Sequence, residues 1–276
     1  MIDILLSTYN GTKYLQEQID SLLNQSFTDW NLLIRDDGSI DNTLDIIDDY
    51  CQKYPDKIKK LSDTNGNVGV IRSFEILLQH SISDYIMFCD QDDVWLPDKI
   101  SLSIQKIKQM EQKAGNIPLL VHTDLMVVDK DLKIIAASLW KLGCIRPEIL
   151  DKNIYYMGMC NSVTGCTLIM NRQAKEKSLP FPKNILMHDA WIALSVMKKG
   201  KIDYIVEPTV QYRQHGSNVY GAEEYKFSLK DKLLRIKNTI NNNLNLYHKS
   251  HPFVYKNFAY FLYHKIKYFC IIHIIK

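Results

Sequence analysis

The sequence predicts an α/β fold, with an open, mostly parallel sheet covered by helices on both faces and a helical extension at the C-terminal end. Short apolar runs typical of strands alternate strictly with amphipathic segments over residues 1–115. Such β-α alternation is the pattern of a parallel sheet with crossover helices. Residues 226–276 depart from it and are basic and aromatic, which favours a separate helical tail.

The first part of the chain provides four strands and four helices. Strands are expected at residues 2–7, 30–34, 58–62 and 85–89, where short apolar runs end in polar turns. Helices are expected at 14–23, 41–50, 70–78 and 96–113, where apolar residues recur at helical spacing.

The pattern changes after residue 115. Residues 119–124 and 125–129 are strand-like, and Lys130-Asp131 indicates a hairpin into 134–135. Residues 137–159 are mixed and allow no assignment. Further strands are expected at 163–170, 204–206 and 210–212, with a helix at 188–199. The glycine in the first of these strands, Gly165, is typical of a close backbone approach.

Composition and cysteine usage are those of an ordinary folded protein. The chain has 276 residues, 46% of them hydrophobic and 24% charged, and its six cysteines contain no Cys-x-x-Cys pair. Scattered cysteines in apolar runs favour reduced thiols and a cytoplasmic protein. Neither a secretory leader nor an apolar run long enough to span a membrane is expected.

Charge is distributed unevenly along the chain. Residues 226–276 contain ten Lys or Arg and one acid, Asp231, whereas the remainder contains 24 basic and 30 acidic residues. Leu229, Leu233, Ile236 and Ile240 predict a basic amphipathic helix, and aromatic residues crowd 253–275. This composition is typical of a helix lying on an anionic membrane surface. A helical subdomain packed on the rest of the chain, or on a second subunit, is the alternative.

Two acidic clusters follow predicted strands. Asp36 and Asp37 follow the second strand, and Asp90, Asp92 and Asp93 follow the fourth. Ligands of open parallel sheets bind outside the carboxyl ends of the strands, so both clusters should face one crevice. Carboxylates held this close together suit a hard divalent cation that also binds substrate phosphates. A solvated turn that begins the next helix, with Pro97 and Asp98, is the alternative.

Five motifs, in order, resemble those of family 2 glycosyltransferases with the GT-A fold. They are STYN at 7–10, DDGS at 36–39, Asn67 with Gly69, DQDD at 90–93 and His188-Asp189, and the resemblance covers residues 1–222. The longer matches DQDDVWLPDK, VTGC, HDAW and YRQHGSN are similar to the rhamnosyltransferase-like branch. The resemblance implies a GT-A domain at 1–225, with a nucleotide-binding half at about 1–115 and an acceptor-binding half at about 116–225, and a tail at 226–276.

The resemblance also implies a metal-dependent, inverting transfer of one sugar from dTDP-rhamnose or a UDP-sugar to a glycan or lipid-linked acceptor in bacterial cell-surface polysaccharide synthesis. The cofactor would be Mg²⁺ or Mn²⁺, and no nucleic-acid partner is expected. The residues implied for the donor are Thr8, Tyr9, Asn10, Asp36, Asp37, Asn67, Gly69, Arg72, Asp90 and Gln91. Those implied for the metal are Asp92, Asp93 and His215, and those for the acceptor are Gly165, His188 and Trp191.

Four of the implied roles have alternatives. Gly165 would let the acceptor approach the backbone, although packing alone would also explain a glycine there. Either Asp92 or Asp93 would contact the metal directly, and His215 could instead be a hydrogen-bonding histidine with Arg213 contacting phosphate. Asp189 is the implied general base, although an acid in the first turn of a helix can simply satisfy backbone amides. His188 is a departure, since the family often has Glu at this position. The Gln-x-x-Arg-Trp element of processive relatives is missing, so one sugar per binding event is expected.

Two other classes of function compete with the transferase. A nucleotidyltransferase on a similar sheet normally needs a glycine-rich, basic phosphate loop after the first strand, and residues 7–12 provide little of it. A non-catalytic module that binds a nucleotide-sugar or a membrane surface is the third class. Loss of turnover with retained donor binding on substituting Asp189 would separate a transferase from such a module.

Overall fold

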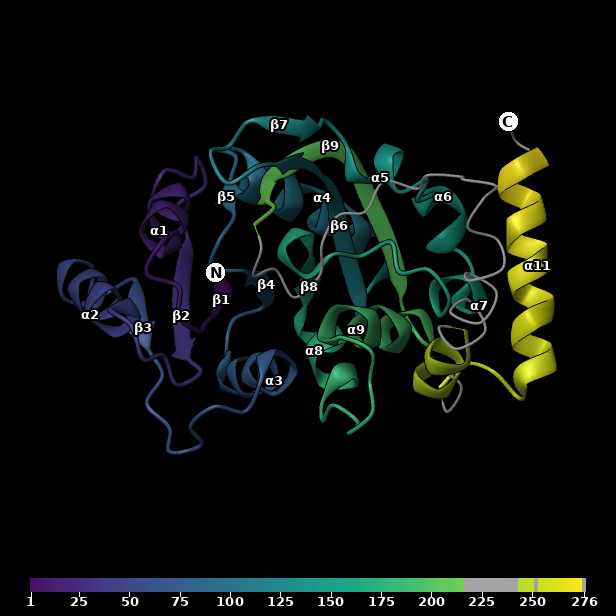
Figure 1. The fold of residues 1–276 in the computed structure, drawn as a ribbon, viewed down its shortest axis with the longest axis horizontal. Coiled ribbons are helices and arrows are strands. Elements are labelled where there is room, and N and C mark those ends of the chain that lie inside the picture. The colour runs from purple at the N-terminus through teal and green to yellow at the C-terminus, as the bar shows by residue number, and fades with distance from the viewer. Residues whose placement is uncertain (216–242, 251–252, 275–276) are drawn as a thin grey trace.

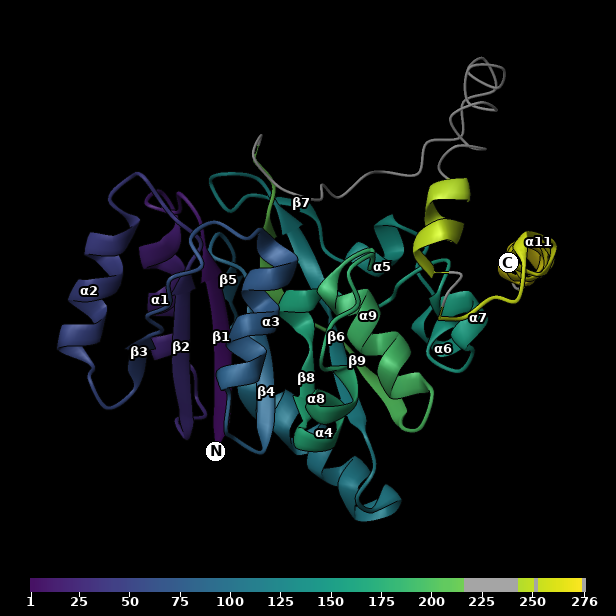
Figure 2. The ribbon, with the colours of Figure 1, turned by 90° about the horizontal axis from the view of Figure 1, so that it is seen from below.

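The computed structural model describes residues 1–215, 243–250 and 253–274 of the chain. A curled central sheet is flanked by helices, and the C-terminal helix α11 lies at the end of the molecule away from α1 and α2 in both views (Figures 1 and 2). In the described residues the sheet has nine strands, in the order β3-β2-β1-β4-β8-β6-β9-β5, with β7 paired to β6. The predicted α/β fold with a C-terminal helical extension is confirmed.

The first four strands form the parallel part of the sheet, as predicted. They are β1 (Ile2–Thr8), β2 (Trp30–Asp36), β3 (Ile58–Lys60) and β4 (Tyr85–Cys89). The helices between and after them are α1 (Leu15–Leu23), α2 (Thr43–Lys53), α3 (Val70–His80) and α4 (Lys99–Ala114). Thr8 pairs with Asp36, and Leu6 pairs with Cys89, so β1, β2 and β4 end at the same edge.

Side chains that alternate along β1 pack against helices on opposite faces of the sheet. Ile4 and Leu6 pack into one buried cluster with α1, α2 and α4. Leu5 packs into a second cluster with α3 and with α9 (His188–Met197). Successive strand residues point to opposite faces, so a strand buried on both sides needs a helix layer on each. Both layers hold the strand ends, and the loops after them, in fixed positions.

The second part of the sheet is mixed. Its elements are β5 (Val94–Trp95), β6 (Leu119–Val128), β7 (Ile134–Ala136), the short helices α5 (Leu139–Leu142), α6 (Pro147–Leu150) and α7 (Ile154–Met157), β8 (Ile169–Asn171), α8 (Arg172–Ser178) and β9 (Lys201–Arg213). The predicted hairpin is confirmed as β6–β7. β6 and β9 are parallel, whereas β8 runs antiparallel to both β4 and β6.

The predicted strand at 163–170 is wrong over most of its length. Gly165–Thr167 form a 3₁₀ turn, η1, and of the predicted strand only Ile169 and Met170 belong to a strand of the sheet, β8. The carbonyl oxygen of Thr164 accepts hydrogen bonds from the backbone N–H of Thr167 at 2.9 Å and from its hydroxyl at 2.7 Å. These local bonds replace a sheet ladder, and the turn carries Gly165 to the edge where the parallel strands end.

The two predicted strands at 204–206 and 210–212 form one continuous strand, β9. Its register against β6 shifts where Ile205 pairs with Thr123 but Pro208 pairs with Asp124, and a proline cannot donate a ladder hydrogen bond. Beyond this irregularity β9 pairs antiparallel with β5, with Val94 opposite Gln211. This pairing brings residues 213–215 beside the acidic loop that precedes β5.

The described part of the tail packs one face against the body of the protein. Residues 243–250 are helical, and α11 spans Phe258–Ile274. The ring of His264 stacks on Tyr155 of α7 with centroids 4.3 Å apart, while Tyr263 and Ile266 are 56% and 64% exposed. No described helix is long and apolar enough to cross a membrane. The amphipathic helix predicted at 229–240 lies outside the described residues.

Candidate active site

A large cleft of about 1020 Å³ opens at the carboxyl ends of β1 and β4. Its walls come from the loops after these strands, from residues 161–165, from the start of α9 and from the end of β9. Four carboxylates line it, those of Asp37, Asp90, Asp92 and Asp189. Among the described lining residues Lys13 is the one lysine or arginine. The cleft therefore needs an added cation to bind a polyanion strongly.

Asp92 and His215 meet in this cleft. Nε2 of His215 lies 2.8 Å from Oδ2 of Asp92, and both side chains are partly exposed. The pairing of β5 with β9 brings them together across 123 residues of sequence. An accessible carboxylate oxygen and an imidazole nitrogen this close are a donor set that fits a divalent cation such as Mn²⁺.

Arg213 holds the acidic loop in place through hydrogen bonds. Its Nε donates to the backbone oxygen of Asp92 at 2.8 Å, and its other nitrogens donate to the carbonyl of Lys130 and to the carboxylate of Glu17. The side chain is 2% exposed. These bonds already engage the guanidinium that was the alternative phosphate contact in the sequence-based prediction.

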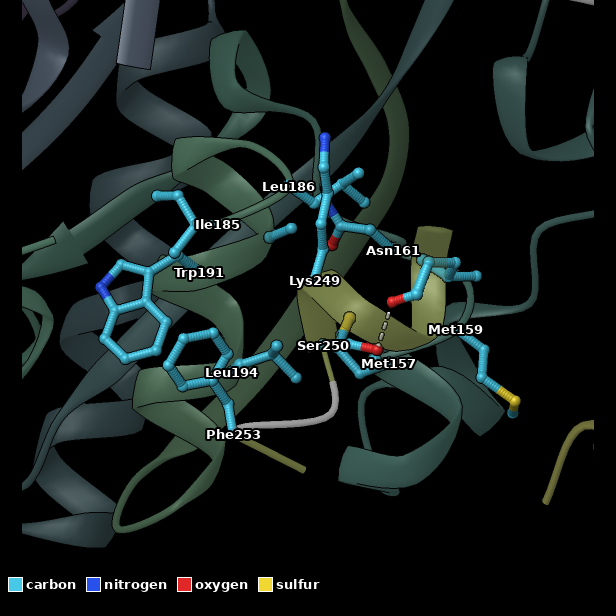
Figure 3. Close-up of a pocket in the computed structure, with 13 residues that line it drawn as sticks. Met157, Met159, Asn161, Ile185, Leu186, Trp191, Leu194, Lys249, Ser250 and Phe253 are labelled. Carbon is cyan, nitrogen blue, oxygen red and sulfur yellow. Dashed lines mark hydrogen bonds between the residues drawn. The ribbon is translucent and has the colours of Figure 1, made fainter. Parts of the chain in front are cut away.

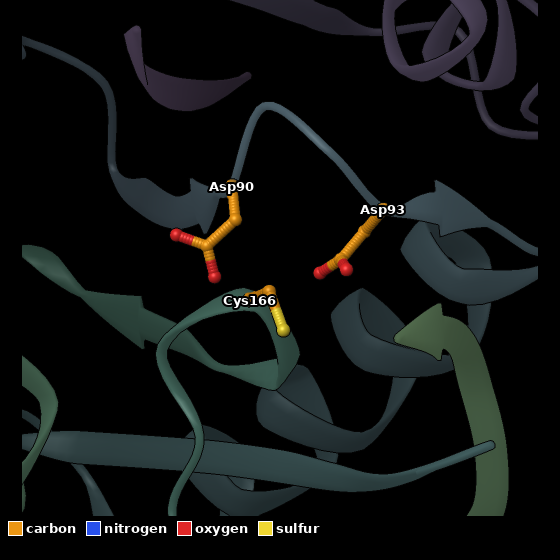
Figure 4. A group of neighbouring side chains, drawn as sticks. All are labelled: Asp90, Asp93 and Cys166. Atoms are coloured by element: carbon orange, nitrogen blue, oxygen red, sulfur yellow. The ribbon is translucent and has the colours of Figure 1, made fainter. Parts of the chain in front are cut away.

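Asp93 is separated from the Asp92–His215 pair. It is fully buried, and one oxygen accepts from the backbone N–H of Arg213 at 3.1 Å. The other oxygen, Oδ2, has no hydrogen-bond partner in the part of the chain that the structure describes. Asp90, Asp93 and Cys166 converge with ligand atoms within 4.8 Å of one another (Figure 4). Burial and the neighbouring acid Asp92 raise the pKa of Asp93 well above its usual range. A buried thiol suits Mg²⁺ and Mn²⁺ poorly, so the Asp92–His215 pair fits such an ion better.

Asp189 lies in the first turn of α9, and hydrogen bonds from two backbone N–H groups and one side-chain amide hold its carboxylate. Oδ2 accepts from the N–H of Gly165 at 3.0 Å, and Oδ1 accepts from the N–H of Ala190 and from the side-chain amide of Asn161, the latter at 3.3 Å. Burial raises its pKa to about 6 despite these hydrogen bonds. Such a carboxylate is ionised at neutral pH, and its pKa is close enough to neutral pH for it to accept a proton during a reaction.

His188 fills the space that Gly165 leaves. A Cβ atom on Gly165 would lie 2.7 Å from Nε2 of His188. The imidazole is 4% exposed and packs on Phe74 and Phe88, with ring centroids 4.4 and 5.3 Å away. Burial lowers its pKa to about 3, so the ring is neutral, and neither ring nitrogen has a hydrogen-bond partner among the described residues. The glycine is thus explained by the imidazole and by the N–H bond to Asp189.

The two acids after β2 have different environments. Asp36 folds back on its own turn, accepting from the N–H of Gly38 at 3.1 Å and from the hydroxyl of Ser39 at 2.6 Å. Asp37 lines the cleft, but its carboxylate is already bound to Arg35 at 2.6 Å and to the N–H groups of residues 68 and 69, each at 2.8 Å. One lone pair of Asp37 therefore remains for a ligand.

The loop after β1 is tied to the loop after β4. The side-chain amide of Gln91 accepts from the N–H of Tyr9 at 2.9 Å and donates to its carbonyl at 3.0 Å. A Cβ atom on Gly11 would lie 2.3 Å from this amide. The tie leaves the Tyr9 ring half-exposed at the cleft. The other predicted donor residues in the cleft lining are Thr8, Asn10, Asn67, Gly69 and Asp90.

Four predicted site residues do not line the cleft. Asp36 and Asp93, described above, are two of them, and Arg72 and Trp191 are the others. The side chain of Arg72 is 52% exposed and pairs with Glu75. Trp191 lies on α9 in an adjoining pocket, where its indole N–H donates to the carbonyl of Ser178 at 2.7 Å. Arg72 and Trp191 were assigned from motif context, which does not determine the direction of a side chain.

Three residues that the sequence-based prediction missed support the site. Asn161 donates to Asp189, Lys13 lines the cleft, and buried Arg35 pairs with both Asp37 and Asp63. A signal existed for Arg35 alone, since it immediately precedes the acidic pair at the end of a strand. Asn161 lies between the unassigned stretch at 137–159 and the strand predicted at 163–170, and no motif includes it.

The fold and the cleft define an α/β protein whose ligand site lies at the ends of its parallel strands and is rich in carboxylates. The sequence model of "Glycosyl transferase family 2" matches residues 3–143. The chain therefore belongs to glycosyl transferase family 2, a family of glycosyltransferase enzymes, as the motif resemblance implied.

Two relatives are similar over most of the chain. An uncharacterized glycosyltransferase of Nostoc sp. is 31% identical over 221 residues, which are 79% of this chain and 66% of that protein. The dTDP-rhamnosyl transferase RfbG of Shigella flexneri is 28% identical over 246 residues, 84% of this chain and 78% of RfbG. The chain thus spans about two thirds of the first relative's length and more of the second.

Solved structures with low identity share the fold. S. aureus TarS 1–349, in complex with UDP, is 18% identical with a TM-score of 0.56, over 77% of this chain and 60% of that one. The mannosyltransferase PcManGT from Pyrobaculum calidifontis, in complex with GDP-Man and Mn²⁺, is 15% identical with a TM-score of 0.57, over 80% and 58%. These similarities confirm the predicted GT-A architecture.

Proposed function

We propose that the protein transfers one sugar from a nucleotide-diphosphate sugar to an acceptor hydroxyl, with inversion at the anomeric carbon. One observation carries the proposal: a single cleft contains both the Asp92–His215 pair, which suits a divalent cation, and a separate, partly buried carboxylate, Asp189, with a pKa of about 6. Charge neutralisation and proton removal are the two tasks of such a transfer.

Asp92 and His215 would hold Mg²⁺ or Mn²⁺, which would neutralise charge on the departing diphosphate when bound. Carboxylates outnumber Lys13, the one lysine among the described residues that line the cleft, and this surplus supports a need for that cation. The complex of PcManGT with Mn²⁺ gives the same indication for a protein of this fold. Asp93 would become a ligand only after turning out of its buried position.

The donor would be dTDP-rhamnose or a UDP-sugar, bound over the ends of β1, β2 and β4. The name of RfbG supports the first, and the UDP complex of TarS supports the second. Asp37 would contact the base through its remaining lone pair, and the loop at Thr8, Tyr9 and Asn10 would pack on base and ribose. Asp90 and Gln91 would lie beside the ribose, while Asn67 and Gly69 close the far side. Arg72, whose exposed side chain pairs with Glu75 outside the cleft lining, would contact the donor from α3.

Asp189 would act as the general base. As the acceptor oxygen bonds to the anomeric carbon, the bond from that carbon to the diphosphate oxygen breaks, and the nucleoside diphosphate leaves with the bonding pair. Asp189 takes the hydroxyl proton. The backbone N–H of Gly165 and the amide of Asn161 fix the carboxylate for this step.

The acceptor would be a glycan or a lipid-linked glycan of bacterial cell-surface polysaccharide synthesis, receiving one sugar per binding event. Gly165 and His188 border the reacting hydroxyl through their contacts with Asp189 and the cleft. Trp191 would act from the adjoining pocket.

Residues 1–225 would form the catalytic domain, with the tail at 226–276 placing it on the inner, anionic face of the cell membrane. The half-exposed Tyr263 and Ile266 of α11 and the basic composition of the tail support this placement.

A thermal-shift screen of nucleotide-sugars with and without Mn²⁺ tests the function. A true donor should raise the melting temperature only with metal, and Asp92→Asn should abolish that dependence while Asp98→Asn, on the exposed loop before α4, should keep it. Product analysis with the stabilising donor should detect nucleoside diphosphate. Pyrophosphate would identify a nucleotidyltransferase instead, and binding without any product would identify a non-catalytic module.

A further inference from the structure

A second, smaller pocket adjoins the cleft. Figure 3 shows the side chains that line it. It lies between α7, α9 and the helical residues 243–250, and its volume is about 30 Å³. Asn161, Leu186 and Ala190 line both this pocket and the cleft. Asn161 donates to Asp189, and Ala190 follows Asp189 in the chain. The two spaces therefore meet at the proposed base.

The lining of this pocket is mostly apolar. Met157, Leu194, Leu246 and Phe253 contribute apolar side chains. The polar groups of two other lining residues are already paired: the indole N–H of Trp191 donates to the carbonyl of Ser178, and the hydroxyl of Ser250 donates to the carbonyl of Leu246, each at 2.7 Å.

Lys249 also lines the pocket, but its ammonium points away from Trp191, Leu194 and Phe253 (Figure 3). An apolar cavity without free polar partners holds water poorly and favours an apolar group. Methionine at its wall lets such a pocket adjust its shape around that group.

The direction of the transfer places the acceptor on this side. For inversion, the acceptor oxygen attacks opposite the bond to the departing diphosphate. The proposed diphosphate site is at Asp92 and His215, so the body of the acceptor extends from Asp189 away from that pair. The pocket lies next to Asp189 on α9, and neither Asp92 nor His215 lines it.

We propose that this pocket is an acceptor subsite for a methyl-terminated substituent of the acceptor sugar. The assignment rests on the proposed function, because it requires the acceptor hydroxyl at Asp189. A volume of about 30 Å³ holds about two water-sized spheres, which accommodates a methyl or ethyl group and excludes a sugar ring or a lipid chain. In sugars this chemistry comes from a 6-deoxy methyl group or from an acetamido methyl group.

Saturation-transfer NMR on the full chain tests the subsite without requiring turnover. Two pairs of methyl glycosides distinguish the sources: L-rhamnoside against L-mannoside, and N-acetylglucosaminide against glucoside. In the wild type, the C6 methyl or the acetamido methyl should receive at least twice the saturation of the ring protons. Leu246→Trp, which fills the pocket, should abolish this excess. Leu244→Trp, on the same helical segment but outside the pocket lining, should keep it.

Equal saturation of methyl and ring protons in the wild type for both pairs, or the same excess in Leu246→Trp, would overturn the subsite. Melting temperatures of both variants within a few degrees of the wild type show that the fold persists. If Leu246→Trp unfolds, Leu194→Phe replaces it with the same expected loss. Failure of the proposed function would be seen separately, as the loss of metal-dependent stabilisation by every nucleotide-sugar while the Leu246-dependent methyl signal remains.

Discussion

At the scale of single residues, the carboxylate of Asp189 is the group whose removal is most informative. Asp189→Asn keeps the size of the side chain and removes the proton acceptor. We expect kcat to fall by about 10²- to 10⁴-fold, the usual contribution of a general base, with the donor affinity unchanged. Steady-state kinetics and donor titration measure the two quantities. Glu176→Gln, at an exposed position of α8 that does not line the cleft, is the control. Transfer at the original rate by Asp189→Asn would refute the assignment.

The same carboxylate should determine the acid limb of the pH profile. A base works in its deprotonated form, and burial raises the pKa of Asp189 to about 6. The plot of kcat/KM against pH should therefore be level above pH 6 and fall by about tenfold per unit below it. Asp90 has its pKa raised to about 7 by burial and by Asp92 and Asp189, so Asp90→Asn should be compared. If the fall in kcat/KM at low pH disappears in Asp90→Asn, then Asp90 and not Asp189 is the group that titrates.

At the scale of elements, the η1 turn positions Asp189 through Gly165. In Gly165→Ala the added methyl group would clash with Nε2 of His188 at 2.7 Å, and the ring cannot retreat easily because Phe74 and Phe88 pack against it. We expect kcat to fall by at least about tenfold, since small misplacements of catalytic groups are costly. Steady-state kinetics and a melting curve separate this loss from unfolding.

A second substitution distinguishes the clash from other effects of the alanine. Gly165→Ala/His188→Ala removes the ring that the methyl group meets, so it should be faster than Gly165→Ala and close to His188→Ala alone. Such non-additivity is expected for residues in direct contact. Equal losses from Gly165→Ala with and without the imidazole would mean that the ring is not the obstacle.

The sequence predicted elements well where periodicity was long and poorly where local hydrogen bonds decided the conformation. The four parallel strands and their helices followed from apolar spacing. The turn at 165–167 did not, because the carbonyl of Thr164 captures Thr167 in a stretch of strand-forming residues. The short helices within 139–157 have four residues each, too few to produce a helical pattern.

At the scale of the whole molecule, the positions of candidate site residues were predictable but their partners were not. Topology placed Asp37, Asp90 and Asp92 at one edge, because parallel strands end together. The pairing of β5 with β9 decided that Asp92, not Asp93, meets His215. The spacing of Asp92 and Asp93 in the sequence does not show which of them meets His215, because they are adjacent residues in the loop before β5. Sequence spacing also does not show that the side chain of Trp191 points into the adjoining pocket and not into the cleft.

The tail gives a prediction for the whole molecule. α11 packs one face on α7 and leaves Tyr263 and Ile266 more than half exposed beside Lys267. If this face lies on an anionic surface, the full chain should sediment with vesicles containing phosphatidylglycerol and not with phosphatidylcholine alone.

Ile266→Glu should weaken sedimentation at least about fivefold. An isoleucine buried in the membrane contributes more than about 1 kcal/mol to binding, and the anionic surface repels the new carboxylate. Ile82→Glu, at a residue 77% exposed on the loop before β4, adds the same charge elsewhere. Equal sedimentation of the two variants would exclude α11 as the membrane contact.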